Sequence, residues 1–212
     1  MPEEDSAALP VGFLRFHRRP FINYQLNRAH ALGYADRDEL AEVAGAIQTC
    51  SDCVDGFDAL SRRAEREGRL KNATSYLRLA EFFTPHRSPQ KLTRYRQYRR
   101  SFDIGFADTG VVRLEVPYES ATLPTYMHPA AGTRCGTVLL HGGFDSLIEE
   151  FFAISQRIAA AGFDVIAFDG PGQGGARRLG GLTFDHDWEK PVRAVLDRFG
   201  LERAALVGIS MG

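Results

Sequence analysis

Three short apolar segments, separated by two amphipathic ones, constrain the second half of this chain more than any other feature. The apolar segments are residues 136–140 (GTVLL), 163–168 (FDVIAF) and 204–207 (AALV). Between them, residues 146–162 and 188–200 carry apolar side chains at helical spacing. Short runs without polar alternation suit strands that are covered on both faces. The alternation of strand and helix therefore predicts an α/β fold with a parallel sheet and right-handed crossovers.

Residues at the ends of these segments give boundary signals. Ser146, with a glutamate three residues later, predicts a capping box at the first helix, and Gly162 stands where a glycine usually ends one. Upstream, residues 111–116 (VVRLEV) alternate apolar and polar side chains, and residues 121–129 (ATLPTYMHP) follow a polar turn. Together they predict an antiparallel hairpin. Pro124 predicts an edge strand, because proline cannot donate a ladder hydrogen bond.

The first half of the chain predicts helices instead. In residues 36–48, apolar side chains recur at i, i+3, i+4 and i+7 behind Asp36, a typical capping residue. Residues 72–83 repeat this spacing, and a proline two residues later ends the segment. We therefore expect two domains: a helical domain over residues 1–101, and an α/β domain over residues 102–212.

The composition argues against several classes of function. The 212 residues carry a formal net charge of −1, so no basic surface favours nucleic acid or an anionic membrane. The densest basic cluster, residues 96–100, fits a solvated helix face. No apolar run approaches the ~18 residues that a membrane-spanning helix requires. The acidic N-terminus lacks the pattern of a signal peptide. We expect a cytoplasmic protein that binds neither nucleic acid nor membrane.

Cys50 and Cys53 form a C-x-x-C pair, a spacing used by redox and zinc sites. A zinc site needs a second pair of ligands, which the sequence does not offer nearby. A thioredoxin-like site needs a strand just before the motif, whereas the preceding residues predict a helix. We interpret both residues as ordinary helix cysteines.

Three loops leave the carboxyl ends of the predicted parallel strands, where ligands of such sheets bind. They are residues 141–146 (HGGFDS), residues 169–175 (DGPGQGG) and the segment that contains Gly208, Ser210 and Gly212. The last has the G-x-S-x-G spacing, which places a nucleophilic serine on a strained turn between a strand and a helix. We therefore predict Ser210 as the catalytic nucleophile.

The glycines of the HGG loop let main-chain N–H groups turn toward a developing negative oxygen. We assign one such donor to Phe144, with Gly143 as the neighbouring alternative. The second donor is Met211, the residue after the nucleophile. His141 is an alternative general base, but a histidine on this loop more often holds the loop by hydrogen bonds.

Gly170, Gly172 and Gly175 satisfy G-x-G-x-x-G, the spacing of dinucleotide-binding loops. That motif must open a helix whose free N–H groups receive a pyrophosphate. Gly180 and Gly181 follow closely and predict that no helix forms there. We therefore interpret this loop as structural.

Three stretches carry a family likeness: LLHGGFDSLIEEFF, FDGPGQG and VGISMG. With the helical first half, they resemble a branch of the α/β-hydrolase superfamily that includes 2,6-dihydroxypseudooxynicotine hydrolase, the fermentation–respiration switch protein and fungal hydrolases that shorten aromatic polyketides. The likeness covers residues 73–212. It implies a helical lid over a serine site that uses no metal or organic cofactor. It also implies cleavage of a carbon–carbon bond next to a ketone, or of an ester-like bond, in a small aromatic substrate.

The resemblance draws attention to Asp145 as a second candidate catalytic residue. Members of this branch carry an acidic residue in this part of the loop. A carboxylate there can orient a phenol or a ketone, or handle a proton during carbon–carbon cleavage. Alternatively, Asp145 only precedes a helix and interacts with its dipole. Both interpretations stay open at this point.

In α/β hydrolases the acid and the histidine of the triad follow the serine along the chain. We therefore expect residues 102–212 to be the N-terminal half of a catalytic domain, inactive alone. The remainder of the hydrolase domain, in the same or a second chain, would complete it. The other expected partner is a small-molecule substrate, and a homodimer stays open. Two further functions stay open: a non-catalytic binding or regulatory protein on the hydrolase scaffold, and an acyltransferase.

Overall fold

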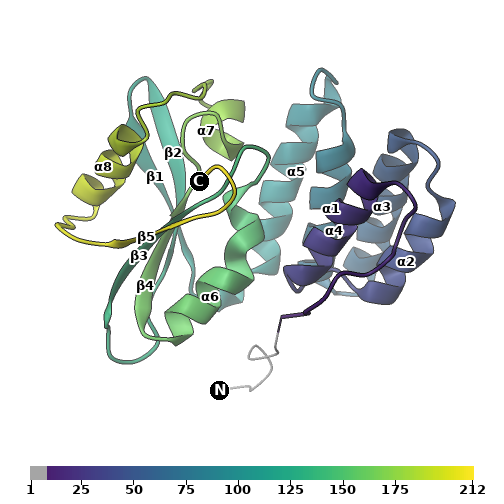
Figure 1. Cartoon of the computed structure of the whole chain (residues 1–212), viewed down its shortest axis with the longest axis horizontal. Coiled ribbons are helices and arrows are strands. Elements are labelled where there is room, and N and C mark those ends of the chain that lie inside the picture. The colour runs from purple at the N-terminus through teal and green to yellow at the C-terminus, as the bar shows by residue number, and fades with distance from the viewer. Residues whose placement is uncertain (1–8) are drawn as a thin grey trace. The chain divides into compact units, whose positions relative to one another are not determined.

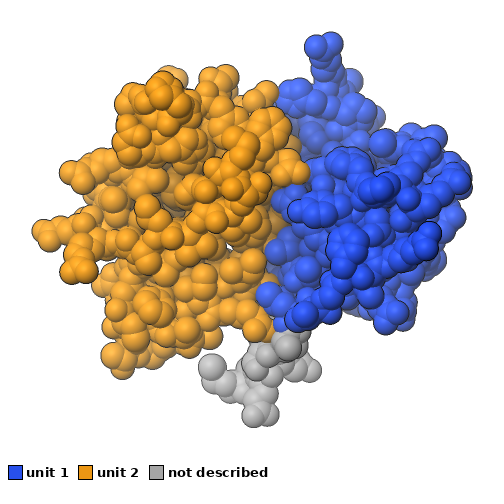
Figure 2. Space-filling model, viewed as in Figure 1, with its two compact units in different colours: residues 1–108 blue, residues 109–212 orange. Residues whose placement is uncertain are grey.

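The computed structural model describes residues 9–212. The chain divides into two compact units, unit 1 (residues 1–108) and unit 2 (residues 109–212), which Figure 2 colours separately. The boundary expected after residue 101 falls inside a helix that continues to Gly105. In the described part of the chain, no helix combines the length and the apolar character needed to cross a lipid bilayer.

Unit 1 consists of helices, the first four of which pack around one apolar core (Figure 1). The helices are α1 (Pro20–Ala31), α2 (Arg37–Ala46), α3 (Cys50–Arg66), α4 (Leu70–Phe83) and α5 (Gln90–Gly105), followed by the 3-10 helix η2 (Ala107–Thr109). Leu26, Leu40 and Phe57, from α1, α2 and α3, are completely buried in this core. The helical spacing of residues 36–48 and 72–83 thus marks the core faces of α2 and α4.

One carboxylate joins three helices of unit 1. Asp36 caps α2, and Glu39 in the first turn then faces α3 and α4. The Glu39 carboxylate accepts hydrogen bonds from Arg63 (3.1 Å), Arg69 (2.7 Å) and the Tyr76 hydroxyl. Burial alone would raise the pKa of Glu39, but the bonds from Arg69, Tyr76 and Arg63 outweigh it and lower the pKa to about 2.

The two cysteines of the C-x-x-C pair lie in the first turns of α3 as free thiols. Cys50 is exposed and Cys53 is buried in the helical core. Burial raises the pKa of the Cys53 thiol to about 12, so this thiol is poorly reactive at neutral pH. The residues before α3 form no strand, which agrees with the interpretation of both as helix cysteines.

Unit 2 is built on a five-stranded sheet (Figure 1). Its strands are β1 (Val112–Tyr118), β2 (Ala121–His128), β3 (Gly136–His141), β4 (Phe163–Phe168) and β5 (Ala205–Gly208). The order is β1-β2-β4-β3-β5. Strands β1 and β2 form the expected antiparallel hairpin, and β3 pairs in parallel with β4 and β5. The three apolar runs of the sequence are therefore the parallel strands.

Helices cover both faces of β3 and β4, whereas the edge strand β5 is largely exposed, so its apolar residues are not covered on both faces. The helices are the 3-10 helix η3 (Ile148–Phe151), α6 (Phe152–Ala160), α7 (Gly174–Arg178) and α8 (Glu189–Arg198). Leu139, Ile166 and Phe168 pack with Val195 of α8 in one core cluster. The alternate side chains of β3 and β4 point to the other face, where α6 lies against β4. Because both faces are covered, β3 and β4 each contain a single polar side chain, Thr137 or Asp164, before their last residue.

Two local expectations about unit 2 are wrong. Pro124 does not mark an edge strand, because β2 lies between β1 and β4. The ladder between β2 and β4 begins only at Thr125, so it does not need an N–H group at Pro124. The Pro124 carbonyl still accepts the N–H of Asp169 at 2.9 Å. Ser146 does not cap a helix either. Its hydroxyl donates to the Gly143 carbonyl at 3.0 Å, and the N–H of Leu147 donates to the Glu150 carboxylate instead.

Replacing the Glu39 carboxylate tests its role in joining the helices. Glu39→Gln is expected to lower the free energy of unfolding by about 2 kcal/mol at pH 7, because two arginines each lose the more buried of their two carboxylate partners. The pKa of Glu39 is lower in the folded state, so this contribution is full above pH 4.5 and disappears as the pH falls toward 2. Urea unfolding of both proteins from pH 7 to pH 3 measures this. A difference that does not shrink over this range contradicts the assignment.

Candidate functional site

The three loops singled out in the sequence begin at the same level of the sheet. His141, the last residue of β3, pairs with Phe168 at the end of β4 and with Gly208 at the end of β5. Parallel strands send their carboxyl ends to one edge, so the loops after β3, β4 and β5 meet there (Figure 1). This edge is the candidate functional site.

Ser210 has a backbone conformation that a serine rarely adopts. Its φ is +65°, and among the described non-glycine residues only Glu119 shares a positive φ. The N–H of Ile209 donates to the His141 carbonyl at 3.1 Å, and the N–H of Gly212 returns to the Ile209 carbonyl at 3.1 Å. These bonds close a tight turn directly after β5, with the exposed Ser210 near its apex. A strained, exposed serine on such a turn is typical of a nucleophile.

The glycines around Ser210 are required by close backbone contacts. A Cβ atom at Gly208 would lie 2.2 Å from the main chain of Gly212, and one at Gly212 would lie 2.7 Å from the His141 carbonyl. A Cβ atom at Gly143 would lie 2.6 Å from the Cβ atom of Ser210. The HGG loop therefore packs directly against the serine turn, as an oxyanion loop must.

The predicted oxyanion donors lie on both sides of this contact. Phe144 follows Gly143 on the loop after β3, and Met211 follows Ser210. Within the described residues, the main-chain N–H groups of Phe144 and Met211 donate to no protein acceptor. They are therefore available to a ligand. The side chains of Phe144 and Met211 are exposed, and the Phe144 ring stacks on Phe184 with ring centroids 5.3 Å apart.

Asp145 lies exposed on the same loop, one residue before Ser146. In the described part of the chain, Ser210 forms a hydrogen bond neither with Asp145 nor with any histidine. The structure thus packs Gly143 against Ser210 and shows no hydrogen bond between Asp145 and this serine.

His141 packs as part of the sheet edge. Its ring stacks on Trp188 with centroids 4.9 Å apart and contacts Phe168 at 5.6 Å. Burial lowers the pKa of His141, so the ring is neutral at pH 7. Its carbonyl anchors the serine turn, which supports a structural role for this residue over that of a base.

The loop after β4 contains two buried polar residues whose roles the sequence analysis missed. Asp169 is 2% exposed, and its carboxylate accepts the N–H groups of Ile148 (3.1 Å) and Gly175 (3.0 Å). Burial and the neighbouring charge of Glu149 raise the pKa of Asp169. Gln173, also 2% exposed, contacts the main chain of the HGG loop. Their position in a loop rich in glycine, between strand and helix, was the available signal.

The sequence predicts that no helix follows the G-x-G-x-x-G stretch, and this prediction is wrong. Helix α7 begins at Gly174 and runs for five residues, because Gly180 and Gly181 come only after its end. The N–H of Gly175 in its first turn is already bound by Asp169. The interpretation of this loop as structural is consistent with that bond.

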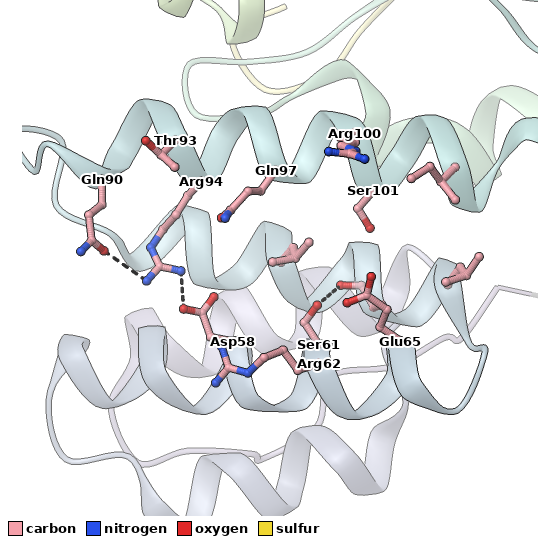
Figure 3. A pocket seen from close by; sticks show the side chains of 14 residues that line it. Asp58, Ser61, Arg62, Glu65, Gln90, Thr93, Arg94, Gln97, Arg100 and Ser101 are labelled. Carbon is pink, nitrogen blue, oxygen red and sulfur yellow. Dashed lines mark hydrogen bonds and ion pairs between the residues drawn. The ribbon is translucent and has the colours of Figure 1, made fainter.

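Two other places in the described residues could attract a ligand. Asp185, His186 and Asp187 lie within 4.8 Å of one another, but they pair with each other and with Lys190 at an exposed site. In unit 1, a hollow of about 640 Å³ lies between α3, α4 and α5 (Figure 3). The Ser61 hydroxyl there donates to a carbonyl of α4 at 2.9 Å, so no base activates this serine.

Comparison with known proteins agrees with this architecture. Residues 138–212 match the family model described as alpha/beta hydrolase fold. The chain has an α/β-hydrolase fold.

Two relatives of the chain come from fungi. The chain is 34% identical to hydrolase acrC of Aspergillus aculeatus over 68% of its own length and 41% of that protein. It is 35% identical to the 20-hydroxy-prefusarin hydrolase FUS2 of Gibberella moniliformis over 66% of its own length and 38% of that protein. The chain thus spans about two fifths of the length of these two relatives.

A solved structure shares the fold. The crystal structure of 2,6-dihydroxy-pseudo-oxynicotine hydrolase superposes with a TM-score of 0.59 and 17% identity, over 85% of this chain and 56% of that one. Together with the family model and the fungal relatives, this shared fold confirms the resemblance to α/β hydrolases that the sequence motifs indicate.

The contact between Gly143 and Ser210 can be tested without a substrate. Gly143→Ala is expected to displace the serine turn, because the new methyl group would overlap Ser210. Hydrogen exchange should then be clearly faster in the peptide that covers residues 205–212. Gly45→Ala, on α2 with open space around it, is the matched control and should leave that peptide unchanged. Equal exchange in both variants contradicts the contact.

Proposed function

We propose that this chain supplies the nucleophile and the oxyanion donors of a serine hydrolase. The observation that carries the proposal is the conformation of Ser210, held at φ +65° with Gly143 packed against it. In a purely structural turn a glycine would adopt the same conformation without this cost.

In the proposed reaction, the Ser210 hydroxyl attacks a substrate carbonyl and forms an acyl-serine intermediate. The N–H groups of Met211 and Phe144, or of Gly143, stabilise the negative oxygen of the tetrahedral species. A histidine accepts the serine proton and returns it to the leaving group. We propose that this histidine and its acid partner come from sequence after the nucleophile, in the same or a second chain, and that residues 1–212 alone are inactive.

We propose a small aromatic carbonyl compound as substrate, cleaved at a carbon–carbon bond next to a ketone or at an ester-like bond. The names of FUS2 and of 2,6-dihydroxy-pseudo-oxynicotine hydrolase describe hydrolases of particular organic compounds. The exposed Phe144 ring beside the site suits an aromatic ligand. If the leaving group is a carbanion or enol, we propose that Asp145 helps to deliver a proton to carbon.

A fluorophosphonate probe tests the nucleophile directly. The experiment uses residues 1–212 within their natural surrounding sequence. There, Ser210 is expected to become covalently phosphonylated. Ser210→Ala is expected to abolish both this labelling and the hydrolysis of p-nitrophenyl acetate. Labelling at another residue, or none, contradicts the proposal and favours a binding or regulatory role. Residues 1–212 alone are expected to hydrolyse the ester no faster than buffer. Addition of an alcohol or amine acceptor distinguishes hydrolysis from acyl transfer.

A further inference from the structure

The Gln173 side chain connects the loop after β4 to the loop after β3. Its Nε2 group donates to the carbonyl oxygens of Gly142 and Gly143, the latter at 3.2 Å. Its Oε1 atom accepts the N–H of Gly170 at 2.9 Å, which holds the side chain to its own loop. All polar atoms of this buried amide group therefore have partners, and one NH₂ group binds two consecutive peptide units.

Each of these bonds fixes the direction of an N–H group in the HGG loop. In a planar trans peptide, the carbonyl of one residue and the N–H of the next share a plane and point in opposite directions. A fixed Gly143 carbonyl therefore fixes the N–H of Phe144, and a fixed Gly142 carbonyl fixes the N–H of Gly143. These two N–H groups are the candidate oxyanion donors on this loop.

The loop needs an external anchor because of its own composition. Gly142 and Gly143 lack side chains that could hold the backbone in one conformation. The Gly143 carbonyl also accepts the Ser146 hydroxyl, at 3.0 Å, whereas Gln173 is the side chain that binds the Gly142 carbonyl. The loss of Gln173 would therefore free the peptide between Gly142 and Gly143 more than the peptide between Gly143 and Phe144, which Ser146 still holds.

We propose that Gln173 is a positioning residue that orients the oxyanion donors toward the carbonyl oxygen of the substrate. This inference rests on the proposed function, because it assigns a role only if Ser210 forms an acyl intermediate. Oxyanion donors stabilise a transition state because they are already oriented before charge develops. Without Gln173, the peptide planes that carry the N–H groups of Gly143 and Phe144 can rotate. The rate of the chemical step then falls, while the affinity for the parts of the substrate outside the oxyanion hole is unchanged.

Two variants test the role of Gln173 in the protein with its natural surrounding sequence. Gln173→Met keeps the length of the side chain and removes its donors and acceptor. Gln173→Glu keeps an acceptor for Gly170 but places a carboxylate against the two carbonyls. Gln156→Met, on α6 and without a hydrogen bond to the HGG loop, is the matched control. Circular dichroism checks that each variant folds, and Gln173→Glu gives the same test if Gln173→Met does not fold.

The expected result is a split between kcat and KM for p-nitrophenyl acetate. In both Gln173 variants, kcat should fall by about 10- to 100-fold, with KM within about 3-fold of the native value. The rate of Ser210 phosphonylation should fall to a similar extent, because the phosphonyl oxygen also uses the donors. The control should stay within about 2-fold.

The outcomes separate this inference from the proposed function. Native labelling at Ser210, with unchanged kcat and labelling rate in the folded Gln173 variants, overturns the role of Gln173 alone. An increase in KM at unchanged kcat also overturns it, because that pattern describes lost substrate binding. No labelling of native Ser210 overturns the proposed function, and the role of Gln173 with it.

Discussion

The parallel pairing of β3 with β4 on one side and β5 on the other is the constraint on which the site depends. Both ladders end at His141, so the three following loops start from one level of the sheet. A shift of the β3–β4 ladder by one residue would turn the buried face of a strand outward. The apolar side chains that α6 and α8 cover on the two faces therefore hold the loops in register, far from the loops themselves.

At the edge of the sheet, the main chain does most of the packing. Gly208, Gly212 and Gly143 allow backbone segments to approach closer than any side chain would permit. Such a site has few side chains to hold it, so buried polar groups act as anchors. Asp169 accepts N–H groups of the main chain, and Gln173 donates to carbonyl groups of the HGG loop. Loss of either side chain would leave its buried main-chain partners without a hydrogen bond, at a cost of about 1–3 kcal/mol for each group.

The fold alone does not determine the activity, because the same scaffold carries many functions. The functional conclusion here depends on local geometry: a serine with positive φ, an adjacent glycine loop and two unoccupied N–H groups. The glycine-rich loop after β4, which resembles a dinucleotide-binding motif in sequence, uses its polar residues to support that geometry instead.

The sequence by itself determined the helical and α/β halves, the three parallel strands and the serine turn, because apolar periodicity and glycine spacing are local patterns. It also indicated Phe144, Gly143 and Met211 as donors. Only the tertiary structure decided that β2 is an inner strand, that Ser146 binds the Gly143 carbonyl and that Gln173 reaches the same loop. These contacts join residues up to 31 positions apart. A buried amide or hydroxyl takes whichever partner the packed strands bring near, and no local pattern specifies that partner.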